Sequence, residues 1–217
     1  MSTLPLQLFK DTLLLLPCSG AKQCGSKPSH AVSILSTLDP ARAAALSNAR
    51  AALRVKAKVD EKTLMPAYLR YSGELYQHGS ESIGRAVAAG GRVLIISGGY
   101  GLLLADEPIG MYDRRFALSE WPTGLLEDCI LDYARHEGIR TVIAVMSRTT
   151  DYSKLIRRVD WRGAGLMAKL LLPVAQGGGA MVKVPRAQGE AVAVLICTGL
   201  PQMWRSSDSL SLKVCEL

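Results

Sequence analysis

The chain has 217 residues, of which 48% are hydrophobic, and it contains neither a run of 18 apolar residues nor a secretory signal, so we expect one globular domain and no membrane partner. Its five scattered cysteines predict reduced thiols in a cytoplasmic protein, and three isolated histidines without a Cys-x-x-Cys motif predict neither a metal site nor a cofactor. The net charge of +7 is compatible with nucleic-acid or phosphorylated partners, although its two basic clusters (42–62 and 148–162) equally fit solvated helix faces.

The first half of the chain predicts an alternation of strands and helices. A buried strand is expected over 13–17, then a polar loop or short helix over 23–36 and a helix over 39–58 that begins at Asp39-Pro40. A helix over 72–89 and a strand over 93–97 follow, and 102–116 is expected to be irregular.

The second half continues the alternation. We expect a helix over 123–136, a strand over 140–146 and a further helix that begins within 153–159. A flexible turn at 177–179, a last strand over 191–198 and a loosely held tail after Trp204 complete the chain. The prediction is a three-layer α/β fold, a single domain over 1–217 with a mostly parallel central sheet in which strands 13–17, 93–97, 140–146 and 191–197 lie side by side.

The end of the first strand is the most informative motif. The leucine run of 13–16 stops at Pro17 and is followed by Cys18, Ser19, Gly20 and Lys22. Small residues allow a ligand to approach the backbone, and ligands of open α/β sheets bind at the carboxyl ends of strands. The loop therefore offers a thiol, a hydroxyl, backbone N–H groups and a cation; an ordinary turn with a surface lysine is the alternative.

A second strand ends in the same way. The apolar run 93–96 leads into Ser97, Gly98, Gly99, Tyr100 and Gly101. This is neither a dinucleotide fingerprint nor a P-loop. An anion-binding nest and a plain glycine-rich turn both remain open.

Four loops thus carry chemistry-bearing residues at predicted strand ends or helix starts. They comprise Cys18, Ser19 and Lys22; Tyr71, Ser72 and Gly73; Ser97, Gly98, Gly99, Tyr100 and Gly101 with Glu107 and Tyr112; and Asp151, Tyr152 and Lys154. Tyrosines stack on planar ligands, hydroxyls and N–H groups bond to polar edges, and cations bind phosphate. We expect Lys22, Tyr71, 97–101, Tyr112 and Lys154 to line one cavity, although each tyrosine is equally compatible with a half-buried core position.

These motifs, in their order along the chain, resemble the YaaA family of peroxide-stress proteins. The matching elements are Ala21-Lys22, Tyr71-Ser72-Gly73, the segment 96–103 with its Ser-Gly-x-Tyr-Gly pattern, Tyr112, and Asp151-Tyr152-Ser153-Lys154. The resemblance spans roughly 13–160, and 161–217 diverges. It implies a protein that binds DNA or a nucleotide and protects against peroxide damage.

A shorter resemblance points to nucleobases. Pro17-Cys18-Ser19-x-x-Lys22, followed by Ser29-His30, is similar to the core segment of archaeosine synthases, which modify a deazaguanine base in transfer RNA. This implies a nucleobase ligand for the first loop.

The alternative to the DNA-binding hypothesis is an enzyme that cleaves or exchanges the N-glycosidic bond of a nucleotide, or modifies its base. Cys18 is the candidate nucleophile if Lys22 or a helix N-terminus lowers its pKa, and Glu74, Glu107 and Asp151 are candidate acids or bases. A third hypothesis is a sensor that binds the same ligand without chemistry. The oligomeric state stays open.

Overall fold

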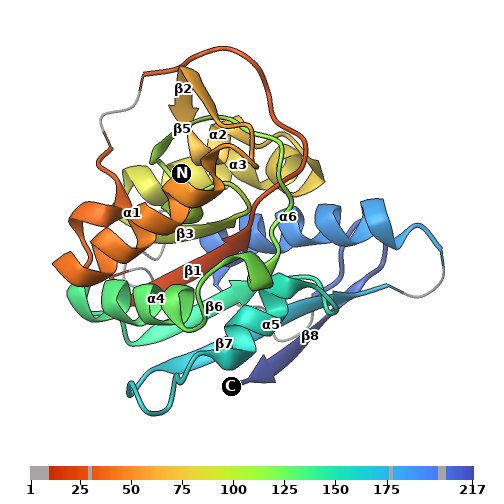
Figure 1. The fold of residues 1–217 in the computed structure, drawn as a ribbon. Coiled ribbons are helices and arrows are strands. Elements are labelled where there is room, and N and C mark those ends of the chain that lie inside the picture. The colour runs from red at the N-terminus through yellow and green to blue at the C-terminus, as the bar shows by residue number, and fades with distance from the viewer. Residues whose placement is uncertain (1–9, 29–30, 176–177, 200–203) are drawn as a thin grey trace.

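A six-stranded sheet runs through the molecule in the order β4-β3-β1-β6-β7-β8 (Figure 1). The computed structural model describes residues 10–28, 31–175, 178–199 and 204–217. Four strands are parallel: β1 (Thr12–Pro17), β3 (Arg92–Ser97), β6 (Thr141–Val145) and β7 (Met167–Val174). Two antiparallel strands, β4 (Gly101–Leu104) and β8 (Ser211–Glu216), form the edges.

The order of the strands reverses at β1. From β1 the chain crosses to β3 on one side, where Leu13 pairs with Arg92. It then returns past β1 to β6 on the other side, where Thr12 pairs with Thr141, and continues to β7. A reversal of this kind leaves a crevice outside the carboxyl ends of the two strands that flank it, here β1 and β6.

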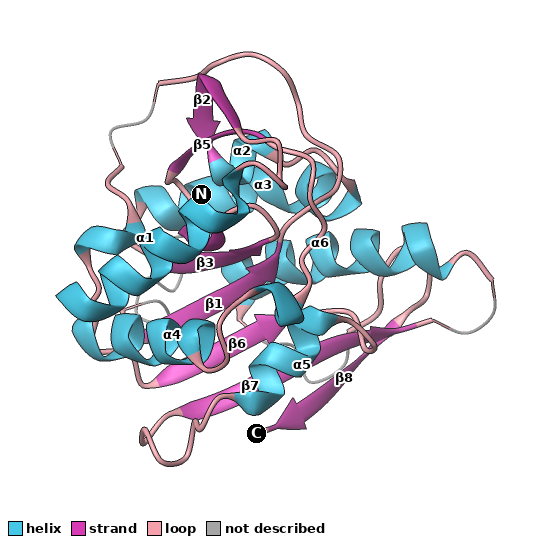
Figure 2. Ribbon diagram, in the orientation of Figure 1, coloured by secondary structure: helices cyan, strands magenta, loops and turns pink. Residues whose placement is uncertain are grey.

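Helices cover both faces of the sheet (Figure 2). One face packs against α1 (Pro40–Arg54), α4 (Leu125–His136) and α5 (Asp151–Arg158). The other packs against α2 (Ala67–Arg70), α3 (Glu74–Ala88) and α6 (Ala180–Thr198). Among the described residues, none of the helices combines the length and apolar character needed to cross a membrane.

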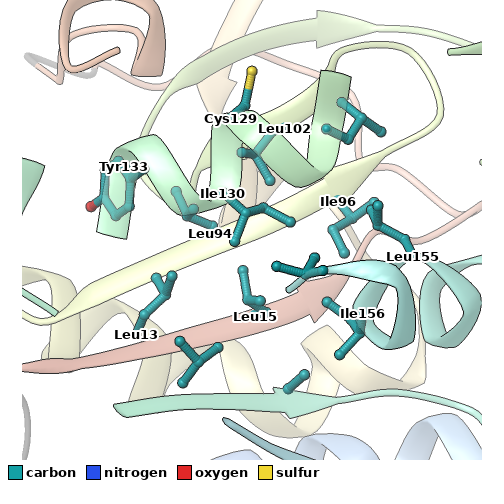
Figure 3. Packing of buried hydrophobic residues seen from close by; sticks show 14 of the residues in the cluster. Leu13, Leu15, Leu94, Ile96, Leu102, Cys129, Ile130, Tyr133, Leu155 and Ile156 are labelled. Carbon is teal, nitrogen blue, oxygen red and sulfur yellow. The ribbon is translucent and has the colours of Figure 1, made fainter. Parts of the chain in front are cut away.

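The continuous leucine run of β1 follows from this two-sided cover. Leu13 and Leu15 belong to the first core, which Figure 3 shows around Ile130 and Ile156. Leu14 and Leu16 belong to the second core, and all four side chains are fully buried. Because side chains alternate along a strand, burial on both faces requires apolar residues at every position.

A small two-stranded sheet stands beside the main one. It pairs β2 (Asp60–Pro66) with β5 (Pro108–Met111) in antiparallel fashion, and two 3₁₀ turns, η2 (Ile34–Ser36) and η3 (Leu118–Glu120), flank the helices. Arg70 is fully buried and donates to the carbonyls of Gln23 (2.7 Å), Thr63 (2.7 Å) and Ile109 (3.4 Å). One guanidinium therefore holds the loop after β1 against both strands of the small sheet.

The predicted α/β fold is confirmed, with its mostly parallel sheet between two helical layers. The strands predicted over 13–17, 93–97 and 140–146 correspond to β1, β3 and β6, and they are neighbours in the sheet. The five predicted helices correspond to α1, α3, α4 and α5, and to the short η2 turn within 23–36. Ser29, His30 and Gly177 lie outside the described residues.

Three predictions are wrong, and they concern the segments 102–116, 191–198 and the tail after Trp204. The segment 191–198 is the end of the 19-residue helix α6, not a strand, because its buried residues fall on one helical face. The fourth parallel strand is instead β7, and 102–116 contains β4 and β5. The tail after Trp204 includes β8, and its side chains are largely exposed. The backbone of β8 pairs with the last six residues of β7.

Candidate functional site

A cavity of about 290 Å³ opens at the carboxyl ends of β1 and β6. Four chain segments contribute to its wall. They are Pro17, Cys18, Ser19 and Gly20 after β1; Gly73, Glu74 and Leu75 at the start of α3; Ser147, Thr150 and Tyr152 around the start of α5; and Met181, Pro185 and Gln188 on α6. The cavity therefore lies at the reversal of strand order, where open α/β sheets bind their ligands.

Two helices begin at this cavity, and neither start has a side-chain cap. The N-cap residue of α3 is Gly73, and that of α5 is Thr150, whose hydroxyl donates instead to the carbonyl of Ser147 (3.1 Å). The first N–H groups of a helix have no partner within the helix and carry partial positive charge. Both starts therefore favour a negatively charged or oxygen-rich ligand in the cavity.

Ser19 fixes the loop after β1 against the start of α3. Its Oγ accepts hydrogen bonds from the backbone N–H groups of Ala21 (3.2 Å) and Gly73 (3.1 Å). A Cβ at Gly73 would lie 2.3 Å from this oxygen, so the contact requires glycine at that position. Because Oγ accepts twice, the hydroxyl hydrogen of Ser19 remains to donate to a ligand.

Lys22 lies beneath the loop and does not line the cavity. Its Nζ donates to the carbonyls of Ser19 and Gly20, both at 3.3 Å, and lies 3.8 Å from the centre of the Tyr112 ring. Burial lowers the pKa of this lysine, and the nearby Cys18 partly opposes that effect. The lysine thus holds the loop in shape and does not offer its charge to the cavity, although the sequence predicted that it would.

Cys18 and Tyr152 meet across the cavity wall. The Cys18 Sγ lies 3.1 Å from the Tyr152 hydroxyl, and the Tyr152 ring stacks on Phe116 with 4.9 Å between centres. Burial raises the pKa of Tyr152, so its hydroxyl is protonated at neutral pH. The half-buried thiol is thus accessible from the cavity and has a hydrogen-bonding neighbour.

The other predicted tyrosines form a buried cluster next to the cavity. The hydroxyls of Tyr71 and Tyr112 lie 2.9 Å apart, and the Ser97 Oγ lies 3.0 Å from the Tyr112 hydroxyl and 3.3 Å from that of Tyr71. Burial raises the pKa of both tyrosines well above the ordinary value. These rings are covered by protein, so they support the loop after β1 and offer no stacking surface to a ligand.

Packing explains the glycine-rich segment after β3. A Cβ at Gly98 would lie 2.4 Å from the carbonyl oxygen of Arg114, and one at Gly99 would lie 2.7 Å from the Tyr112 ring. Gly101 has φ +72°, and a Cβ at this position would lie 2.6 Å from the Trp121 ring. The Ser97 Oγ also accepts from the N–H groups of Gly99 and Tyr100 (3.3 and 3.2 Å), so these two N–H groups are engaged within the turn.

Glu107 and Tyr100 have structural partners away from the cavity. The Glu107 carboxylate is buried, pairs with Arg50 (3.1 Å), and accepts from the Ser33 hydroxyl (2.7 Å) and the Ile34 N–H (2.9 Å). The Tyr100 hydroxyl bonds to the Gly110 N–H and to Glu61. Neither residue lines the cavity at the carboxyl ends of β1 and β6.

The remaining candidate residues divide between the cavity and the surface. Glu74 lines the cavity and pairs with Arg186 of α6 at 3.0 Å. Asp151 accepts from the Leu118 N–H (3.0 Å) and pairs with the exposed Lys154 (2.8 Å), whose hydrogen bond lowers the pKa of Asp151. Ser72 joins the loop after β1 by donating its N–H to the carbonyl of residue 21.

The prediction that Lys22, Tyr71, 97–101, Tyr112 and Lys154 line one cavity is wrong, because none of them lines the cavity at the ends of β1 and β6. Lys22, Tyr71, Ser97, Gly99 and Tyr112 do come together, since Lys22 and Gly99 both contact Tyr112. They form the cluster behind the cavity, and Lys154 lies apart from them on the exposed side of α5. Of the predicted residues, those that line the cavity are Cys18, Ser19, Gly73, Glu74 and Tyr152.

One wall of the cavity went unpredicted because the pattern over 191–198 favours a strand where α6 lies. This wall contains Met181, Pro185 and Gln188. Gln188 is 2% exposed, and its Nε2 has no hydrogen-bond partner among the described residues. The helical signal was present in the spacing of the buried positions 187, 188, 191, 192, 195 and 196.

No family model matches the chain, and no curated protein matches it either. Within the described ranges, no group of three or more histidine, cysteine, aspartate or glutamate side chains is placed to hold a metal ion. The chemistry open to the site is therefore argued from its own side chains and backbone.

Proposed function

We propose that the chain binds a nucleotide, or a small molecule that carries a nucleobase, in the crevice between β1 and β6. The observation that carries this proposal is the cavity at the reversal of strand order, bounded by the uncapped starts of α3 and α5. Mononucleotide sites of doubly wound folds combine these same two features.

The size of the crevice supports a ligand of this class. A second cavity of about 440 Å³ adjoins the first and shares Ser147, Met181 and Pro185 with it. It continues between α6 and the end of β7, where Pro173 and Val174 line it. Small-molecule sites typically measure about 300–1,000 Å³ and combine apolar walls with a few polar groups.

Two groups in the crevice are suited to chemistry on such a ligand. The Cys18 thiol is a nucleophile when it is deprotonated, and the Glu74 carboxylate can accept a proton. An enzyme that cleaves or exchanges a glycosidic bond, or modifies the base, would use these two side chains. A sensor would bind the same ligand in the same place without turnover.

Binding is tested by calorimetry with the four common ribonucleosides and their 5′-monophosphates. Gly20 lines the cavity, and a Cβ added to it would meet no atom within 4 Å, so Gly20→Trp fills the crevice at little cost to the fold. We expect binding to the native chain and its loss in Gly20→Trp. Glu81→Trp, at an exposed position of α3 that lines neither cavity, is the matched control. Equal binding by all three proteins would contradict the proposal.

Turnover is tested separately. Each ligand that binds is incubated with the native chain, and release or alteration of the base is followed by chromatography. Loss of turnover with retained binding in Cys18→Ser would support an enzyme, and binding without any product would support a sensor. A ligand altered equally fast by Cys18→Ser would exclude the thiol as nucleophile.

DNA binding, which the YaaA resemblance implies, is a second candidate, and the net charge of +7 favours it. Many of the basic side chains in the two clusters already pair with carboxylates, as Arg42, Arg54 and Arg158 do with Asp39, Glu61 and Glu127. Duplex binding through phosphate contacts must weaken steeply as salt rises. A titration with duplex DNA between low and physiological salt tests this candidate, and protection of DNA from peroxide cleavage tests the stress-related function.

A further inference from the structure

We propose that the crevice has two chemically different compartments, and that the one around Ser19 and Gln188 binds the phosphate of a phosphate monoester. The compartment along β7 and the start of α6 then holds the organic part of the same ligand. This inference rests on the proposed function and specifies which part of the ligand binds where.

The unpartnered amide of Gln188 is the first observation. Gln188 is 2% exposed, lines the cavity, and has no partner for its Nε2 among the described residues. Buried polar groups are nearly always hydrogen-bonded, and an unmet buried donor is costly. A ligand oxygen that reaches this amide removes that cost, so the position is built for an acceptor from outside the chain.

The close crossing of α3 and α6 holds Gln188 against the start of α3. A Cβ at the adjacent Gly189 would lie 2.4 Å from the carbonyl oxygen of Leu75 and 2.9 Å from the Cβ of His78. A Cβ at Gly79, one turn further along α3, would contact Gly189 at 3.4 Å. The two helices therefore meet backbone to backbone, and the amide of Gln188 faces the same cavity as Glu74 and Leu75.

Three further donors face this compartment. The N–H groups of Glu74 and Leu75 lie in the first turn of α3, where no earlier helical residue can accept from them. The Ser19 hydroxyl has accepted twice and retains its hydrogen for a ligand. Phosphate offers several strong acceptor oxygens and negative charge, which this set of donors and the helix dipole both favour.

The compartment also contains one carboxylate. Glu74 lines it, but its Oε2 lies 3.0 Å from Arg186 Nε and 3.6 Å from His78 Nε2. The arginine belongs to α6 and also approaches Asp208 at 3.5 Å. The ion pair offsets the repulsion that a free carboxylate would exert on a phosphate.

The adjoining compartment has a different character. It is lined mainly by apolar residues of the end of β7 and the start of α6, namely Pro173, Val174, Ala175, Ala180, Met181, Val184 and Pro185. Ser147, Arg148 and Thr149 supply polar groups on its other side. An apolar cavity with a few polar groups suits a planar organic group that has hydrogen-bonding edges.

The test compares nucleosides with their 5′-monophosphates, and with inorganic phosphate, by calorimetry on the native chain and on Gln188→Met and Gln188→Glu. We expect the native chain to bind the best monophosphate at least about tenfold more tightly than its nucleoside, as charge-assisted hydrogen bonds require. Gln188→Met should lower this preference, and Gln188→Glu should abolish it by placing a carboxylate beside the phosphate. Gln77→Met, an exposed substitution on α3, is the matched control.

A readout without ligand accompanies the binding data. Gln188→Met has a similar volume and removes the unpartnered donor, so we expect its melting temperature to equal or exceed that of the native chain. A large loss of stability in Gln188→Met would mean that the amide has a partner within the fold, and it would overturn the proposal.

The outcomes separate this inference from the proposed function. Equal affinity for nucleoside and monophosphate would overturn the phosphate subsite while leaving nucleobase binding in place. Gln188-dependent binding of inorganic phosphate, without binding of any nucleoside or nucleotide, would support the subsite and overturn the proposed function. Absence of binding by every probe would overturn both.

Discussion

The ammonium of Lys22 lies 3.8 Å from the centre of the Tyr112 ring. The same ammonium donates to the carbonyls of Ser19 and Gly20, and the Tyr112 hydroxyl bonds to Tyr71. The loop after β1 is therefore supported from below by a cation resting on an aromatic cluster. Its cavity side presents Cys18, Ser19 and Gly20 instead.

Lys22→Met should destabilise the fold by about 1 kcal/mol, the size of a partly desolvated cation–π contact. Ligand affinity should fall only modestly, because the loop loosens while its lining residues stay present. Urea unfolding and calorimetry measure the two effects, with the exposed Lys56→Met as control. Unchanged stability with a complete loss of binding would show that Lys22 contacts the ligand directly.

Glu107→Gln should destabilise the fold by about 3 kcal/mol, because it leaves the partly buried Arg50 without its carboxylate partner. The backbone N–H groups of Ile34 and Leu104 also bond to this carboxylate. Glu61→Gln breaks a more exposed pair with Arg54 and should cost much less. Because Glu107 lies away from the crevice, we expect unchanged ligand affinity under conditions where the variant is folded. A loss of ligand affinity in the folded variant would show that Glu107 contributes to the binding site.

Gly189→Ala should force α3 and α6 apart, because its Cβ would meet the Leu75 carbonyl oxygen at 2.4 Å. Overpacking of this kind costs about 1–3 kcal/mol. Gly178→Ala, where a Cβ meets no atom within 4 Å, is the control for the same substitution in open space. Thermal unfolding of the two variants compares them, and equal melting temperatures would mean that the helix crossing adapts to the larger residue.

Raising the pH above about 10 should weaken the fold. The chain has seven tyrosines, and burial raises the pKa of every one: Tyr68, Tyr71, Tyr76, Tyr100, Tyr112, Tyr133 and Tyr152. The folded state then retains protons that the unfolded state releases, so stability is present below pH 10 and declines as the pH rises above it. Each fully buried tyrosine, such as Tyr71, Tyr76 and Tyr112, contributes up to about 1.4 kcal/mol per pH unit in that range.

Tyrosinate absorbance and urea unfolding between neutral and alkaline pH check this expectation. Ionisation should accompany unfolding, and Tyr112→Phe should show a shallower decline of stability with pH. The half-buried Tyr68 gives Tyr68→Phe as a control with a smaller change. Ionisation of most tyrosines in a chain that remains folded would contradict the burial described above.

The sheet centre was predictable because burial on both faces imposes an unbroken apolar run, as in 13–16 and 93–96. The same kind of run gave the wrong prediction of a strand at 191–198, because consecutive valine, alanine and leucine residues are typical of both a buried strand and a buried helix. Only the wider spacing from Ala187 to Ile196 distinguishes the helix. β4 and β5 are four residues each and contain Gly101 or Gly110, so they were too short to show a pattern.

The cavity was predictable where it follows from strand ends and helix starts. Cys18, Ser19 and Glu74 were found for that reason, and Tyr152 likewise follows β6. Whether a tyrosine hydroxyl faces a ligand or another hydroxyl depends on long-range packing, which joins Tyr71 to Tyr112. No local sequence pattern contains that information. Gln188 was not predicted as a site residue because the helix α6 that contains it was not predicted.

The position of β1 at the centre of the sheet has a consequence for how the protein folds. β1 is paired on both sides only when Leu13 pairs with Arg92 and Thr12 pairs with Thr141, which are far away in the sequence. Contacts between such distant parts of a chain slow folding, and an unpaired leucine-rich strand promotes aggregation meanwhile. Refolding yield should therefore fall as protein concentration rises, and a chaperone that shields exposed apolar segments should restore it.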